Sequence, residues 1–93
     1  MKTKTFYRFR LRDSKTLIIP DTPHEIWDEE VVHAEKDSIV GSFELTRKQC
    51  QDSIKDGIVA TYQGRVGKAD IRIDDCYLEE VTEKVREIDP NSL

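Results

Sequence analysis

The sequence contains few of the features that mark membrane proteins, secreted proteins or disulfide-rich folds. No apolar run approaches the roughly 20 residues that a membrane-crossing helix needs. Residues 1–4 lead into alternating polar and aromatic residues and not into the apolar core of a signal peptide. We therefore expect no membrane span, no secretion and a cytoplasmic location. The short length predicts that residues 1–93 form a single small domain.

Residues suited to catalysis or metal binding are also scarce. Cys50 and Cys76 lie 26 positions apart with no CxxC pair, which favours reduced thiols over a disulfide. His24 and His33 lie nine positions apart, about 900° of rotation on one helix, so they would point to opposite sides. Because no nucleophile has a base at a suitable spacing, we expect a non-catalytic protein without a metal or cofactor.

Charge is distributed unevenly along the chain. The net charge is −4, from 15 basic and 19 acidic residues. Residues 1–20 hold six basic side chains and one acidic one, whereas residues 21–37 hold seven acidic side chains and one basic one. Such blocks either cover each other in the fold or present two faces of opposite sign to a partner.

The first segment has the alternation of a half-buried strand. Across residues 3–12, Tyr7, Phe9 and Leu11 alternate with Arg8, Arg10 and Arg12, which predicts an apolar inner face and a basic outer face. Turn residues follow around Ser14, and residues 16–19 are apolar or β-branched up to Pro20. The pattern therefore predicts a first hairpin that closes near Ser14.

The next segment begins with a helix-start signal. Thr22 and Glu25 have the spacing of a capping box, and Pro23 occupies the first helical position. A helix from here would carry Trp27 at the edge of its apolar side. The alternative, in which Val31 and Val32 open a strand that runs to Glu35, stays open. We favour the helix.

The middle of the chain predicts a strand, a helix and a second hairpin. Residues 39–45 form a strand pattern in which Gly41 marks a bulge. Thr46 is placed to cap a helix over residues 47–56 that ends at Gly57. Residues 58–62 and 70–73 then read as two strands joined across two glycines, Gly64 and Gly67.

The last segment has helical spacing. From Asp75 onward, the apolar residues are separated by three, four and three positions; they are Leu78, Val81, Val85 and Ile88. We expect a terminal amphipathic helix. The complete pattern predicts an α+β fold, with two hairpins and one further strand in a mainly antiparallel sheet that two or three helices cover.

The arginine-bearing strand is the strongest candidate for a binding site. Alternate residues on a strand stand about 7 Å apart, close to the phosphate spacing of an extended nucleic acid, and Phe6 adds a stacking surface. The structural alternative, which we weigh more heavily, is that Arg8, Arg10 and Arg12 pair with the acidic segment 25–35. Trp27 is interpreted first as a core residue and second as an interface anchor.

From these observations we expect a protein that binds another protein and forms a homo-oligomer. The candidate contact residues are Phe6, Arg8, Arg10, Arg12 and Trp27. The alternative is a binder of nucleic acid or of a small anionic nucleotide through the three arginines. The size is consistent with a small accessory or virus-encoded regulator.

Overall fold

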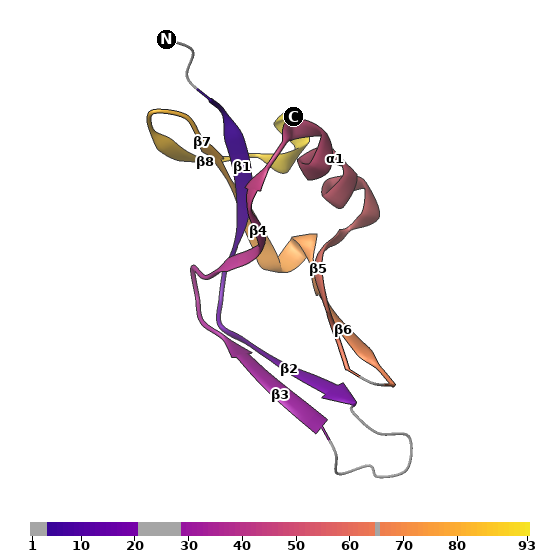
Figure 1. Cartoon of the computed structure of the whole chain (residues 1–93). Helices are drawn as coiled ribbons and strands as arrows, with labels where there is room; N and C mark the ends of the chain where they lie inside the picture. The colour runs from indigo at the N-terminus through magenta and orange to yellow at the C-terminus, as the bar shows by residue number, and fades with distance from the viewer. Residues whose placement is uncertain (1–3, 21–28, 65) are drawn as a thin grey trace.

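The computed structural model describes residues 4–20, 29–64 and 66–93. These residues form eight strands, one α-helix and two short 3₁₀ helices (Figure 1). In chain order the elements are β1 (Phe6–Leu11), β2 (Lys15–Pro20), β3 (Glu29–Ala34), β4 (Ile39–Leu45), α1 (Arg47–Asp56), β5 (Ile58–Gln63), β6 (Lys68–Arg72), a 3₁₀ helix (Ile73–Asp75), β7 (Cys76–Val81), β8 (Val85–Ile88) and a second 3₁₀ helix (Pro90–Ser92). Among these residues no helix is long and apolar enough to cross a membrane.

The strands form one four-stranded sheet and two separate hairpins, all antiparallel. The larger sheet has the order β4-β1-β7-β8, whereas β2 pairs with β3 and β5 pairs with β6. The predicted α+β class is confirmed in this coarse form. The described residues contain one α-helix in place of the expected two or three, and three separate sheets take the place of one.

The core lies on the inner face of β1, as the alternation predicted. Tyr7, Phe9 and Leu11 are buried, and Phe9 is opposite Leu78 on β7. Helix α1 lies beside the sheet and contributes Cys50, which is fully buried (Figure 1). The remaining buried members of this core are Leu17, Val40, Ile71 and Cys76.

Both ends of α1 are determined locally, and both were predicted. The Thr46 hydroxyl accepts a hydrogen bond from the backbone N–H of Gln49, and the Gln49 side chain accepts one from the N–H of Thr46. Gly57 ends the helix in the left-handed conformation, with φ of 76°. The helix bounds therefore match the prediction.

Two further predictions are confirmed near the middle of the chain. Strands β5 and β6 form a hairpin in which the Gly64 N–H donates to the Gly67 carbonyl over 2.8 Å. Gly41 in β4 has a φ of 76°, and the pairing of β4 with β1 shifts register between Tyr7 and Phe9. The irregularity expected at Gly41 is therefore present.

The predicted hairpin between the first two strands is wrong. Strand β1 pairs with β4 and β7, and β2 turns away to pair with β3. We call the β2–β3 hairpin the arm. It extends from the rest of the molecule beside β6, which gives the protein an elongated shape of 56 × 24 × 23 Å (Figure 1). The central position of β1 between two other strands satisfies its backbone groups without β2.

The helix expected after Pro23 is also wrong for residues 29–34, which form β3. The alternative strand is therefore the correct one in that range. Val31 lies opposite Ile18, and Val32 lies opposite Leu17, so two β-branched residues pair across the arm. The expected capping box at Thr22 and Glu25 lies outside the described residues.

The terminal helix is wrong as well, because residues 76–88 form the β7–β8 hairpin. Leu78 lies opposite Ile88, and Val81 lies opposite Val85. The two members of each pair are the same number of residues from the turn between β7 and β8. Apolar residues placed symmetrically about a turn have the same spacing as one face of a helix. The hairpin prevails because it hydrogen-bonds to β1 and buries Leu78 against Phe9.

Candidate functional site

Three of the predicted contact residues lie together on the outer face of the four-stranded sheet. Phe6 is opposite Val81, Arg8 is opposite Glu79, and Arg10 is opposite Tyr77. We call these six residues of β1 and β7 the arginine face. Alternation along β1 places them on the side away from the buried Phe9.

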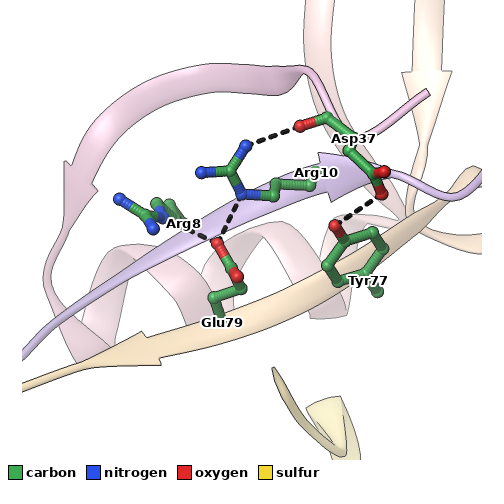
Figure 2. Close-up of polar contacts among 5 residues, drawn as sticks. All are labelled: Arg8, Arg10, Asp37, Tyr77 and Glu79. Carbon is green, nitrogen blue, oxygen red and sulfur yellow. Dashed lines mark hydrogen bonds and ion pairs between the residues drawn. The ribbon is translucent and has the colours of Figure 1, made fainter. Parts of the chain in front are cut away.

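A single carboxylate holds both arginines of this face. The Nε atoms of Arg8 and Arg10 donate to the same Oε1 atom of Glu79, at 2.7 and 2.5 Å (Figure 2). The three side chains are only 19%, 25% and 14% exposed, respectively. Burial acts to raise the pKa of Glu79, but the hydrogen bonds and charges of the two arginines outweigh it and hold that pKa below its usual value.

The turn before β4 is attached to the same face. Arg10 donates through a second guanidinium nitrogen to the carbonyl of Asp37 over 2.6 Å, and the Tyr77 hydroxyl donates to the Asp37 carboxylate over 2.8 Å (Figure 2). Asp37 has a positive φ of 69°, a conformation that Asp adopts more readily than most residues. Burial and the hydrogen bond to Asp37 raise the pKa of Tyr77.

Arg12 lies beyond the end of β1 and has a different environment. Its Nε atom donates to the carbonyl of Cys76 over 3.1 Å. Nearby, Lys15 forms an ion pair with Asp75 at 2.9 Å, and these residues line a small surface pocket with charges of both signs. The structure thus brings Phe6, Arg8 and Arg10 together and places Arg12 apart from them.

The acidic partner differs from the one that the sequence predicted. Among the residues that the structure describes, Arg8 and Arg10 form their ion pairs with Glu79 on β7, whereas the expected partner was the segment 25–35, of which 25–28 lie outside that description. Sequence reasoning missed Glu79 because it assigned residue 79 to a helix. Trp27, the remaining predicted contact residue, lies outside the described residues.

The arm carries an exposed apolar pair that sequence reasoning did not single out. Ile18 and Val31 lie opposite each other and are 55% and 50% exposed. Next to them, the Thr16 hydroxyl and the His33 Nδ1 atom form a hydrogen bond of 3.0 Å. We call Ile18 and Val31 the arm patch. The arm patch can be recognised only once β2 is known to pair with β3, because that pairing places Ile18 opposite Val31.

The other face of the arm is turned toward the core. Leu17 is buried and belongs to the same hydrophobic cluster as Ile71 of β6. Val32, opposite Leu17, is half-buried against that cluster. The arm is therefore anchored by one face, while the arm patch is on the other.

The two thiols are structural in character. Cys50 and Cys76 are free and buried, and burial raises the pKa of each to about 11. Such thiols are protonated at neutral pH and react slowly as nucleophiles. Among residues 4–20, 29–64 and 66–93, no group of three potential metal ligands occurs.

Comparison of the chain with protein-family models, with curated proteins and with solved structures yields no match. The assignment of a function therefore rests on the geometry of the arginine face and of the arm.

Proposed function

We propose that this protein is non-catalytic and acts by binding another protein through the edge of β3 and the arm patch. The observation that supports this proposal best is the directly opposed pair of Ile18 and Val31, which is half-exposed on a hairpin that extends from the rest of the molecule (Figure 1). Contiguous exposed apolar surface marks a protein-contact site more often than isolated apolar residues do.

The outer edge of β3 is less protected than either edge of the four-stranded sheet. At one end of the large sheet, β4 is interrupted at Gly41, and at the other end β8 has four residues with Arg86 and Glu87 at its centre. Interruptions, short strands and charges discourage pairing at an edge. Strand β3 has six residues in uninterrupted register and valines at its centre. Such an edge suits the addition of a strand from a partner.

The arginine face offers weaker support for protein binding. Arg8 and Arg10 already share Glu79, so a partner that bound either guanidinium would have to compete with an existing ion pair of low exposure. Binding of nucleic acid or of an anionic nucleotide through Arg8, Arg10 and Arg12 remains the alternative proposal. A steep loss of affinity between low and moderate salt would favour that alternative.

The test compares the wild type with two valine variants. Val31→Glu places a charge in the arm patch, while Val66→Glu changes a valine of equal exposure, 49%, between β5 and β6. Each tagged protein is used to capture partners from its source cells, and the captured partner is then titrated by calorimetry. We expect Val31→Glu alone to weaken binding by about tenfold or more. Equal binding by wild type and Val31→Glu would refute the proposed function.

A further inference from the structure

We infer that three consecutive residues, Asp75, Cys76 and Tyr77, fix the direction of the arm, and that the arm turns as a unit about its two connections when their contacts are lost. We call these three residues the latch. The first connection, residues 12–14, joins β1 to β2, and the second, residues 35–38, joins β3 to β4 (Figure 1). The inference goes beyond the proposed function, because it concerns how the arm is held and not what binds to it.

The first connection is bonded to the first two residues of the latch. The backbone N–H of Arg12 donates to the carbonyl of Asp75 over 2.9 Å, and the Arg12 side chain donates to the carbonyl of Cys76 over 3.1 Å. At the beginning of β2, Lys15 forms an ion pair of 2.9 Å with the Asp75 carboxylate. The base of β2 is therefore attached to two adjacent residues by both backbone and side-chain contacts.

The second connection is held through Asp37. Among the described residues, Asp37 is the only non-glycine residue with a positive φ, and such a conformation persists where surrounding contacts fix it. Its N–H donates to the carbonyl of Leu11 over 2.9 Å. Its carbonyl accepts from Arg10, and its carboxylate accepts from Tyr77 of the latch (Figure 2). The N–H, the carbonyl and the carboxylate of Asp37 are thus all bonded.

Apolar and polar contacts hold the arm in different ways. Leu17 and Val32 pack with the core, and this burial attaches the arm without specifying a direction, because the hydrophobic effect is non-directional. The hydrogen bonds of the latch do specify one, because they weaken steeply when their atoms are misaligned. Within the arm, β2 and β3 pair without a register shift, so the arm moves as one piece.

A double variant, Lys15→Met with Tyr77→Phe, removes both side-chain contacts between the latch and the connections while it preserves most of the apolar packing. Asp37→Asn is the matched control, because the amide oxygen still accepts from Tyr77 and Asn tolerates a positive φ. Lys4→Met is a second control. It removes an ion pair of the same length, 2.9 Å, with Glu44, at the opposite end of β1 from the arm.

Spin labels report the direction of the arm. Ile18→Cys on β2 and Val85→Cys on β8 carry the labels, because these positions are 55% and 51% exposed. The native Cys50 and Cys76 are buried. Pulsed electron resonance then gives the distribution of distances between the arm and the four-stranded sheet. We expect one narrow distribution for the unmodified latch and for both controls, and a broader or shifted distribution for the double variant.

Hydrogen exchange of the unlabelled proteins, followed residue by residue by NMR, distinguishes a turning arm from a general loss of stability. Loss of a hydrogen bond to a charged group shifts a local opening equilibrium by about tenfold or more. We therefore expect the amides of Arg12 and Asp37, which lie in the two connections, to exchange about tenfold faster in the double variant. Exchange within the β2–β3 pair and within the β1–β7 pair should stay unchanged.

Three results would each overturn the inference. The first is a distance distribution for the double variant that equals that of the unmodified protein. The second is a distribution for Asp37→Asn as broad as that of the double variant. The third is equal acceleration of exchange in the connections, the arm and the sheet, which would show that the contacts serve overall stability. The proposed function is tested separately by Val31→Glu and does not depend on these results.

Discussion

Replacing Glu79 by Gln should destabilise the protein more than any other single removal of charge on the arginine face. Both Arg8 and Arg10 donate to one oxygen of this carboxylate. The substitution preserves the size of the side chain but removes the negative charge. Two guanidinium groups would then remain close together with no anion between them.

The exposure of the three side chains determines the expected magnitude. Removing one partner of a fully buried ion pair costs about 3–5 kcal/mol, whereas an exposed pair contributes about 0.2–1 kcal/mol. The side chains here are between 14% and 25% exposed, so we expect a loss of about 1–3 kcal/mol in the free energy of unfolding. For a chain of this length, a loss of about 2 kcal/mol lowers Tm by roughly 8–16 °C.

Urea and thermal unfolding, followed by circular dichroism, measure this loss. The matched control is Glu44→Gln, because Glu44 pairs with Lys4 at 2.9 Å but the two side chains are 56% and 73% exposed. We expect the control to lose less than about 1 kcal/mol. Equal stability of Glu79→Gln and wild type, or equal losses in the two variants, would refute the reasoning.

The pH dependence provides an independent check. The pKa of Glu79 is lower in the folded protein than its usual value, so its contribution to stability is present above the unfolded-state pKa of about 4.3. That contribution is lost as the pH falls through the depressed folded-state pKa. The stability difference between wild type and Glu79→Gln should therefore be full at neutral pH and shrink in acid. A difference that stayed constant into strong acid would contradict the role of the carboxylate charge.

Two further predictions concern the backbone and the thiols. Gly41→Ala and Gly57→Ala should each cost about 1–2 kcal/mol because both glycines have a φ of 76°. Urea unfolding should show the greater loss of unfolding free energy for Gly41→Ala, because its added Cβ would lie 3.3 Å from the carbonyl oxygen of Val59. A greater loss for Gly57→Ala would contradict this prediction. Cys50 and Cys76, with pKa values of about 11, should be alkylated by iodoacetamide at pH 8 about a hundredfold more slowly than in urea. Equal rates of alkylation in the two conditions would show that the thiols are accessible.

Locally encoded elements could be predicted from the sequence. Helix α1 lies between the Thr46 capping box and Gly57, and both signals act within a few residues of the helix ends. The β5–β6 hairpin is likewise determined locally, because its turn contains both glycines, Gly64 and Gly67. The inner face of β1 follows from strict alternation, because opposite faces of a strand need residues of opposite polarity.

The candidate surfaces were predicted only in part. Alternation placed Arg8 and Arg10 on one face, and the structure confirms that placement. Their partner Glu79 and the opposition of Ile18 to Val31 depend on which strands pair. Local sequence carries little information about which strands pair. The strand that pairs with β1 can lie close along the chain or, like β7, some 70 positions away.

The sequence alone was enough to place both ends of α1, the turn between β5 and β6 and the apolar side of β1, since capping, turn chemistry and alternation act over a few residues. Tertiary structure decided the partners: β1 bonds to β7 across some 70 positions, and residues 76–88 become a hairpin because that form hydrogen-bonds to β1 and buries Leu78 against Phe9. Helix and hairpin share the same apolar spacing there. Hydrogen bonding to β1 and burial against the rest of the molecule distinguish the two, and strand pairing also creates the arginine face and the arm.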